Sequence, residues 1–357
     1  MKTILHVVGA RPNFMKLAPV YDALTKYEGI NQVILHTGQH YSPNMSDIFF
    51  EQLGIPLPTI NLEINGGSPL NQIGNGIIKL EPEIQKIKPN VCCIYGDINA
   101  TAFTSIVTSK LGIKLAHIEA GLRSHDLNMP EETNRIIADA LTDYFFTPSL
   151  DANENLITEG RKPENIFFVG NVMIDTLIKF LPAIETTPLQ VNIPGKYILV
   201  TLHRPSNVDD PNQLKSILAA LSEIAQKYTI VFPMHPRTKA MLSQLDNIDL
   251  SNFLITEPLD YFRFIKLQKS AVLIITDSGG VQEESTYLGV PCFTLRDNTE
   301  RPVTVTHGTN VLVGTDVAKL KTNLTAFEMG DIKKGTIPEL WDGQSGKRIA
   351  EIISKLI

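Results

Sequence analysis

The sequence predicts an α/β protein built of two Rossmann-like, doubly wound domains, and three observations support this. Short apolar runs alternate with helical patterns through most of the 357 residues. The apolar runs are continuous rather than alternating, as in parallel strands that are buried on both faces by helices. The length is too great for one ordinary core and suits two domains of about 150–200 residues.

The first half of the chain carries six predicted strands, at 3–8, 32–36, 91–95, 114–118, 144–147 and 166–169. Helical patterns fill the gaps between them, at Met15–Lys26, Gln72–Lys86, Thr101–Lys110 and Glu132–Asp143. Strand–helix alternation of this kind is typical of a parallel sheet covered on both faces. These elements make up the first predicted domain, residues 1–180.

The pattern breaks at 181–195, which contains three prolines and no periodicity, and we predict a linker there. The second domain is predicted at 196–340, with a helix at Gln213–Lys227. Its strands are expected at 197–202, 229–233, 253–255, 271–275, 291–295 and 310–313. The last stretch, 341–357, is predicted to be a helix that packs back on the first domain. Ligands of such sheets bind beyond the carboxyl ends of the strands, so two facing domains imply an inter-domain active-site cleft.

Composition excludes several classes of protein. The net charge of −6, without a long basic run, argues against a nucleic-acid partner. The three cysteines are too few for a disulfide framework and lack metal-ligand spacing, so we expect no metal. The chain enters a strand directly, without a signal peptide, and no apolar run approaches membrane-spanning length. We therefore expect a cytoplasmic protein with no membrane partner.

Residues 276–291 carry the strongest indication of a ligand. An apolar strand runs into Ser278, and Gly279 and Gly280 then open a helix with carboxylates in its first turn. Adjacent glycines permit close approach, and the N–H groups that begin a helix suit a phosphate. A carboxylate one turn further can accept hydrogen bonds from the hydroxyls of a ribose. The spacing indicates a nucleotide diphosphate, although the two glycines alone equally fit an ordinary strand-to-helix turn.

Three carboxylates of the first predicted domain lie just after predicted strands or at the start of a helix. Asp97 and Glu119 each follow a strand, and Glu131 opens a helix. We expect the three to converge on one rim, where crowded carboxylates raise one another's pKa values and can do general acid–base work. Each has an ordinary alternative, since Asp97 could cap a helix and Glu131 favours a helix N-terminus.

Cations and histidines follow other strands. Arg11 and Lys16 could hold an anion or be solvated surface charges. His203 is a candidate proton donor or phosphate ligand, because imidazole titrates near neutrality. His235, between prolines, has a structural or a functional use, and Arg301 either closes over a ligand or forms an inter-domain ion pair.

Three cofactor or nucleophile motifs are missing from the sequence. The first strand is followed by Gly9-Ala10-Arg11-Pro12 rather than Gly-x-Gly-x-x-Gly, and neither a P-loop nor Gly-x-Ser-x-Gly occurs. The sequence therefore gives little support to a nicotinamide-dependent enzyme or a serine hydrolase, and we expect no cofactor.

Eight motifs occur together in order: GARPNFMK at 9–16, TGQH at 37–40, YGD at 95–97, HIEAGLRS at 117–124, PEETNR at 130–135, HRPSN at 203–207, MHPRT at 234–238, and TDSGGVQEE to RDNTERP at 276–302. Together they resemble the non-hydrolysing UDP-N-acetylglucosamine 2-epimerases. The resemblance implies a GT-B-type fold, and an isomerase that interconverts UDP-N-acetylglucosamine and UDP-N-acetylmannosamine without NAD. In that family the C2 proton is removed while UDP leaves C1, and UDP then adds back to a 2-acetamidoglucal.

The resemblance also implies roles for individual residues. The matching catalytic positions are Asp97, Glu119, Glu131 and His203. The matching phosphate and uridine contacts are Arg11, Lys16, Arg135, Ser278, Gly279, Gly280, Glu284 and Arg301. A second, activating substrate molecule would be near Gln39, His40, Gln72 and His235. A homodimer is expected on the same ground.

The sequence departs from the commonest family pattern near the expected sugar site. It has Ala10 and Asn13 where many members have Thr and Glu, Ile98-Asn99 where threonines often follow the Asp, and Pro205-Ser206 where Arg-Glu is usual. The exact sugar is therefore open, and UDP-2,3-diacetamido-2,3-dideoxy-glucuronic acid is the nearest alternative substrate. A GT-B glycosyltransferase and a non-catalytic nucleotide-sugar-binding regulator are the two rival functions.

Overall fold

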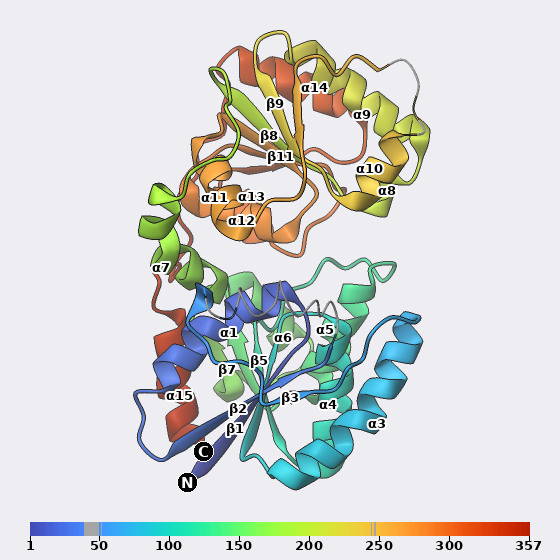
Figure 1. Ribbon diagram of the computed structural model, residues 1–357. Helices are drawn as coiled ribbons and strands as arrows, with labels where there is room; N and C mark the ends of the chain where they lie inside the picture. Colours follow the sequence, from blue (N-terminus) through green and yellow to red (C-terminus); the bar gives the residue numbers. More distant parts are fainter. Residues whose placement is uncertain (39–49, 51, 244, 246–247) are drawn as a thin grey trace. The chain divides into compact units, whose positions relative to one another are not determined.

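A computed structural model describes residues 1–38, 50, 52–243, 245 and 248–357 (Figure 1). The chain divides into two compact units. Unit 1 is Met1–Ile178 with Glu339–Ile357, and unit 2 is Lys179–Pro338. Each unit contains one parallel sheet with intervening helices, so the predicted α/β class is confirmed. Within the described residues, no helix combines the length and apolar character that a membrane span requires.

The sheet of unit 1 has the strand order β3-β2-β1-β4-β5-β6-β7. The bounds are β1 Lys2–Val8, β2 Ile30–His36, β3 Ile60–Asn61, β4 Val91–Tyr95, β5 Lys114–Ile118, β6 Tyr144–Thr147 and β7 Ile166–Phe168. Six of these strands match the predicted ones within two residues at each end. The sequence prediction missed β3, because two residues are too short to show a period.

The helices of unit 1 are α1 Arg11–Leu24, α3 Pro69–Ile87, α4 Asn99–Leu111, α5 Pro130–Leu141, α6 Leu150–Thr158 and α15 Ser345–Leu356. Helix α7, Val172–Thr186, begins in unit 1 and ends in unit 2. Proline stands in the first turn of α1, α3 and α5, where its missing N–H costs nothing. Apolar side chains of α3 and α4, including Leu80 and Phe103, pack against Leu5 and Cys92 of the sheet. The sheet edge beyond the carboxyl ends of β4 and β5 carries Asp97 and Glu119.

Two boundaries differ from the prediction. Helix α7 runs to Thr186, so the linker predicted at 181–195 is wrong over 181–186, where Pro182 lies inside the helix. The division between the units falls after Ile178, and unit 1 resumes at Glu339. Helix α15 lies beside α1 (Figure 1). Gly346 permits this contact, because a Cβ there would lie 2.5 Å from the carbonyl oxygen of Pro19.

A buried carboxylate joins α7 to the start of α15. Asp175 Oδ2 accepts a 2.7 Å hydrogen bond from the Gly346 N–H. Burial raises the pKa of Asp175 to about 6, although the N–H groups of Gly346 and Ser345 lower it. The only tryptophan of the chain, Trp341, lies four residues before α15 in the sequence and is buried. Its indole N–H donates to the carbonyl oxygen of Pro148. Its fluorescence therefore reports on the unfolding of unit 1.

The raised pKa of Asp175 predicts a pH-dependent stability. Protonation stabilises the fold fully below the ordinary value of 3.8, and this contribution is lost as pH rises through about 6. Relative to Asp175→Asn, the wild-type unfolding free energy should fall by about 3 kcal/mol between about pH 4 and 7. Urea unfolding followed by Trp341 fluorescence measures both proteins. Parallel stability curves for the two proteins would contradict this assignment.

Unit 2 repeats the architecture with the strand order β10-β9-β8-β11-β12-β13. The strands are β8 Tyr197–Thr201, β9 Thr229–Pro233, β10 Phe253–Thr256, β11 Leu273–Thr276, β12 Cys292–Thr294 and β13 Asn310–Leu312. The helices are α8 Pro205–Val208, α9 Pro211–Ile224, α10 Pro236–Leu242, α11 Tyr261–Ser270, α12 Gly279–Leu288, α13 Pro302–Thr306 and α14 Val317–Glu328. All six strands match predicted strands within two residues at each end.

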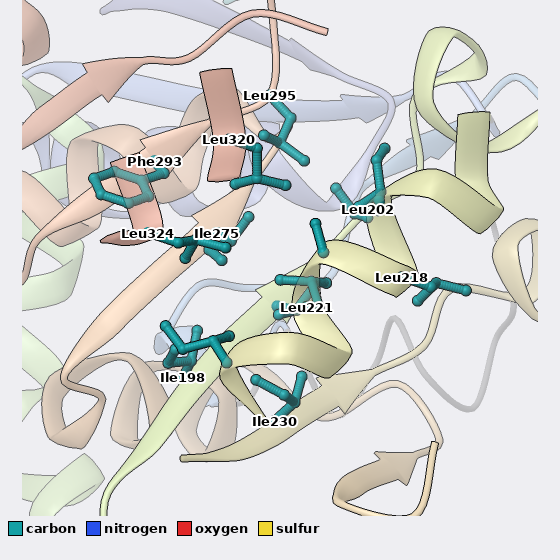
Figure 2. Packing of buried hydrophobic residues seen from close by; sticks show 14 of the residues in the cluster. Ile198, Leu202, Leu218, Leu221, Ile230, Ile275, Phe293, Leu295, Leu320 and Leu324 are labelled. Carbon is teal, nitrogen blue, oxygen red and sulfur yellow. The ribbon is translucent and has the colours of Figure 1, made fainter. Parts of the chain in front are cut away.

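Both faces of the unit 2 sheet are buried, which explains its continuous apolar strands. Ile198 and Ile275 contribute to the core on one face, where Leu221 of α9 and Leu324 of α14 pack (Figure 2). The alternate residues of the same strands, including Leu199, contribute to a separate core with α11 and α12. Successive side chains of a strand point to opposite faces, so no polar side of the sheet remains.

Candidate active site

The first constituent of the site is a buried ion pair in unit 1. Glu119 directly follows β5 with a backbone φ of +72°, which is uncommon for a residue with a side chain. Its Oε1 lies 2.8 Å from the Nζ of Lys16 on α1, and both side chains are buried. Gly96 makes room for the pair, because a Cβ there would lie 2.5 Å from Lys16 Nζ. The structure thus places Lys16, a predicted phosphate contact, against a predicted catalytic acid.

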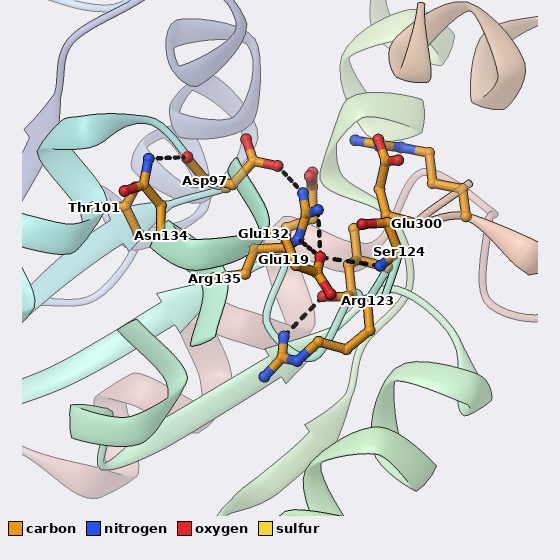
Figure 3. Close-up of polar contacts among 12 residues, drawn as sticks. Asp97, Thr101, Glu119, Arg123, Ser124, Glu132, Asn134, Arg135 and Glu300 are labelled. Atoms are coloured by element: carbon orange, nitrogen blue, oxygen red, sulfur yellow. Dashed lines mark hydrogen bonds and ion pairs between the residues drawn. The ribbon is translucent and has the colours of Figure 1, made fainter. Parts of the chain in front are cut away.

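Asp97 belongs to a second ion-paired group (Figure 3). Arg135 contacts both Asp97 and Glu132 and is only 1% exposed. Glu132 Oε2 lies 2.6 Å from Arg135 and also accepts the N–H of Ser124 at 3.0 Å. Burial alone would raise the pKa of Glu132, but the hydrogen bonds from Ser124, Arg135 and His125 outweigh it and hold that pKa below its usual range. Asp97 is the more accessible member, with 21% of its side chain exposed.

The structure adds a buried carboxylate, Glu132, that the sequence prediction did not name. Glu131 is only partly buried in the first turn of α5, whereas its neighbour Glu132 is buried and holds Arg135. Sequence reasoning missed Glu132, although its spacing of three residues from Arg135 on a helix favours an ion pair. The loop of Asp97 adjoins Glu119, since a Cβ at Gly96 would lie 3.8 Å from Glu119 Oε1.

A chain of amide side chains leads from Gln72 to the Asp97 loop. Asn99 Nδ2 donates to Gln72 Oε1 at 2.9 Å. Asn134 Nδ2 lies 3.2 Å from Asn99 Oδ1 and donates to the carbonyl oxygen of Asp97 at 2.9 Å. Gln72, predicted to be near a second substrate molecule, is thereby connected to the backbone of a predicted catalytic acid.

Two predicted site residues, and the side chain of a third, lie outside the part of the chain that the structure describes. Gln39 and His40 lie outside the described residues. Arg11 begins α1, and its side chain is likewise outside the part that the structure describes.

In unit 2 the imidazole of His203 is held by a buried carboxylate. His203 Nδ1 lies 2.9 Å from Asp277 Oδ1, and Asp277 has no exposed surface. The N–H groups of His203 and Arg204 and the Nδ2 of Asn207 also donate to this carboxylate, at 3.0, 2.9 and 3.1 Å. Burial alone would raise the pKa of Asp277, but these donors, with His203 foremost, keep it below its usual range.

The contact with Asp277 fixes how His203 faces its surroundings. Because Nδ1 faces the carboxylate, Nε2 is the ring nitrogen directed to other groups, and 40% of the side chain is exposed. His235 lies nearby, with ring centroids 5.9 Å apart. His235 Nδ1 accepts the N–H of Arg237 at the start of α10. Burial, and then the charges of His203 and Arg237, lower the pKa of His235.

The two glycines that open α12 differ in their surroundings. A Cβ on Gly279 would lie 2.6 Å from a guanidinium nitrogen of Arg301 and 2.8 Å from Glu300 Oε1. A Cβ on Gly280 would meet no described atom within 4 Å. Ser278 precedes the helix, and its own N–H donates to Thr276 Oγ1 at 3.0 Å. Gly279 therefore serves internal packing, and Gly280 is the glycine with open space before it.

The remaining residues of unit 2 that were predicted to contact UDP, Glu284 and Arg301, are buried and interact with other side chains of this unit. Arg301 contacts Glu300, and its Nε lies 3.0 Å from Glu283 Oε1. Glu284 Oε2 accepts from Gln268 Nε2 at 2.6 Å. The sequence prediction left the partner of Arg301 open between a ligand and an ion pair, and the structure shows an ion pair within unit 2. Among the described residues, no cluster of three or more His, Cys, Asp or Glu side chains has metal-binding geometry.

Comparison with known proteins identifies the family. The family model of UDP-N-acetylglucosamine 2-epimerase matches residues 22–354. A UDP-N-acetylglucosamine 2-epimerase of Methanocaldococcus jannaschii is 43% identical over 98% of each chain. A UDP-2,3-diacetamido-2,3-dideoxy-D-glucuronate 2-epimerase of Pseudomonas aeruginosa is 41% identical over 99% of each chain.

Solved structures agree with this relationship. The crystal structure of the M. jannaschii enzyme in complex with UDP-GlcNAc and UDP gives a TM-score of 0.90 at 41% identity, covering 99% of this chain and 100% of that one. The lipopolysaccharide outer core galactosyltransferase WaaB shares the fold alone, with a TM-score of 0.59 at 12% identity over the full length of both chains. The chain belongs to the UDP-N-acetylglucosamine 2-epimerase family.

Proposed function

We propose that this protein interconverts UDP-N-acetylglucosamine and UDP-N-acetylmannosamine by elimination and re-addition of UDP. The observation that carries the proposal is the pair of carboxylates that follow the neighbouring strands β4 and β5, each in contact with a cation: Glu119 with Lys16, and Asp97 with Arg135. Inversion at C2 needs a base on one face of the sugar and an acid on the other, so one carboxylate alone is not sufficient.

The chemical steps follow from these groups. A carboxylate of unit 1 takes the proton from C2, and the electrons of that bond form the C1–C2 double bond as the C1–O bond breaks. UDP leaves with the electron pair of the C1–O bond, and 2-acetamidoglucal remains. In the second step UDP adds back to C1, and a protonated group delivers a proton to the opposite face of C2. Asp97, Glu119 and Glu131 are the candidates for these two roles.

Unit 2 supplies groups that suit the UDP. The N–H groups at the start of α12, where Gly280 faces open space, are donors for a diphosphate. His203, oriented by Asp277, can direct Nε2–H to the oxygen that becomes negative as UDP leaves. Arg301 contributes positive charge to this region, but its pairing with Glu283 and Glu300 reduces that contribution.

The rival functions differ in what they need. A glycosyltransferase of the same fold transfers the sugar to an acceptor and has no need for acids on both faces of C2. A regulator would bind UDP-sugars without turnover. The 41% identity with the Pseudomonas aeruginosa enzyme makes UDP-2,3-diacetamido-2,3-dideoxy-glucuronic acid the alternative substrate. Homodimerisation, a cytoplasmic location and a second substrate site at Gln39, His40, Gln72 and His235 stay predictions from the resemblance.

Conversion of UDP-N-acetylglucosamine without acceptor or nicotinamide tests the proposal, with Gly280→Val as its variant. In the wild type, NMR should show UDP-N-acetylmannosamine forming, and UDP should raise the melting temperature by binding the native state. Gly280→Val should abolish both effects without lowering the melting temperature of the ligand-free protein, because its side chain enters open space. Gly74→Val is the matched control, a helical glycine in unit 1 whose Cβ also meets nothing within 4 Å.

Two outcomes would count against these assignments. Absence of turnover in the wild type with both UDP-sugars, despite UDP binding, would favour the regulator. If UDP stabilised the wild type and Gly280→Val equally, the proposed binding of the diphosphate at the start of α12 would be wrong.

A further inference from the structure

A buried group of charged side chains lies behind the proposed acids, and the chemistry above does not use it. His117 Nδ1 lies 2.7 Å from Asp139 Oδ1, and both side chains have no exposed surface. Arg123 lies 2.8 Å from Asp139 Oδ2 and 2.7 Å from Glu159 Oε1. Buried charges are costly unless they are paired and hydrogen-bonded, so such a group is not simple filling of a core.

Both ring nitrogens of His117 face acceptors. Nδ1 faces the Asp139 carboxylate, and Nε2 lies 2.8 Å from the carbonyl oxygen of Gly96. Burial alone would raise the pKa of Asp139, but His117 and Arg123 outweigh it and hold that pKa below its usual range. The Arg123 guanidinium and the Gly121 N–H both contact Asp139 Oδ2, so this carboxylate acts as an acceptor. A neutral imidazole has one N–H and could satisfy only one of the two contacts. An imidazolium, with both nitrogens protonated, would satisfy both contacts.

The same group contacts the loops of both proposed acids. Gly96, bonded to His117 through its carbonyl oxygen, directly precedes Asp97 and has a left-handed φ of +64°. Gly121 lies two residues after Glu119, and its N–H donates to Asp139 Oδ2 at 3.1 Å. A displacement of His117 would thus shift both loops together.

We propose that His117 is a positioning residue, present as an imidazolium, which together with Asp139 fixes the two loops that carry Asp97 and Glu119. The inference rests on the proposed function for what these acids do. His117 is fully buried and acts on the substrate only through the loops. The cluster pairs two cations, His117 and Arg123, with two carboxylates, so it orients the loops without adding net charge next to the acids.

Two amide substitutions separate the two contacts of the ring. The Nδ2 of Asn occupies the place of Nδ1, so His117→Asn keeps the bond to Asp139 and loses the bond to Gly96. The Nε2 of Gln reaches the place of Nε2, so His117→Gln keeps the bond to Gly96 and loses the bond to Asp139. If His117 positions the Asp97 loop, kcat should fall about 100-fold in His117→Asn, which loses the bond to Gly96. In His117→Gln, which keeps that bond, kcat should fall only about 10-fold. KM and the UDP dissociation constant should stay near wild type in both.

Urea unfolding monitored by Trp341 supplies the stability of each variant, since a purely structural His117 would make kcat follow stability rather than the retained contact. Equal kcat values in the two variants, or a larger loss in His117→Gln, would overturn the proposal. ¹⁵N NMR of the wild type tests the charge state even if the variants do not fold. Both His117 nitrogens should show the ¹⁵N shifts of protonated ring nitrogens, and a neutral ring would overturn the imidazolium. An inactive wild-type protein would count against the proposed function and not against the role of His117. In that case the ¹⁵N NMR result alone would test this inference.

Discussion

Glu119→Gln is expected to lower kcat for epimerisation about a thousandfold while UDP still binds. Glutamine keeps the shape of the side chain but cannot accept or deliver a proton, and loss of a general acid or base typically costs about 10²–10⁴ in rate. Steady-state kinetics with UDP-N-acetylglucosamine measures kcat, and the melting shift with UDP measures binding. A variant with wild-type kcat would remove Glu119 from the chemistry.

The same substitution has a second consequence, which needs a control. Glu119→Gln leaves the buried ammonium of Lys16 without its carboxylate. Breaking a buried ion pair costs about 3–5 kcal/mol, so Trp341 fluorescence should show a marked loss of stability in unit 1. Adding Lys16→Met removes the unpaired charge and should recover much of that stability. Recovery of kcat in the double variant would show that Lys16, rather than the lost proton transfer, caused the defect.

Asp277→Asn is expected to lower kcat by up to about 10⁴-fold, the size of loss seen when a carboxylate that orients a catalytic histidine is replaced by an amide. Asp277 accepts hydrogen bonds only, including those from Asn207 and the N–H groups of His203 and Arg204. The amide NH₂ of asparagine would confront one of these donors, and His203 would lose the partner that fixes its tautomer. The defect should therefore be in orientation rather than in UDP binding.

A double-mutant cycle distinguishes this role from a general structural one. If Asp277 acts through His203, then His203→Gln combined with Asp277→Asn should lose no more activity than His203→Gln alone. Fully multiplicative losses would show that the two residues act independently.

The fold was predictable because many of its strands, such as β8 and β11, carry continuous apolar runs. Ile198 and Leu199 are consecutive and belong to cores on opposite faces of one sheet, which gives a continuous rather than an alternating pattern. The helix starts were less accurate, because prolines such as Pro12 and Pro130 favour the first turn of a helix as much as they interrupt one. Pro182 misled in the same way, since it lies within α7 where a linker was predicted.

The sequence indicated where the candidate acids lie on the sheet but not which side chains they pair with. Asp97 and Glu119 could be named because they follow parallel strands, where ligands bind. The contact of Lys16 with Glu119 joins residues 103 positions apart, which no local pattern reports. The sequence prediction assigned Arg135 to a phosphate, although its guanidinium forms an ion pair with Glu132, one turn earlier on α5. The catalytic roles of these residues stay predictions.

The central claim is that the C2–H bond of the sugar breaks during turnover. The most direct test is conversion of UDP-N-acetylglucosamine in heavy water, followed by NMR of the sugar ring. Because the groups that remove and return the C2 proton exchange with solvent, the UDP-N-acetylmannosamine formed should carry deuterium at C2. Glu119→Gln should lose this exchange together with epimerisation. Product that retains its original hydrogen at C2 would contradict the elimination–addition mechanism.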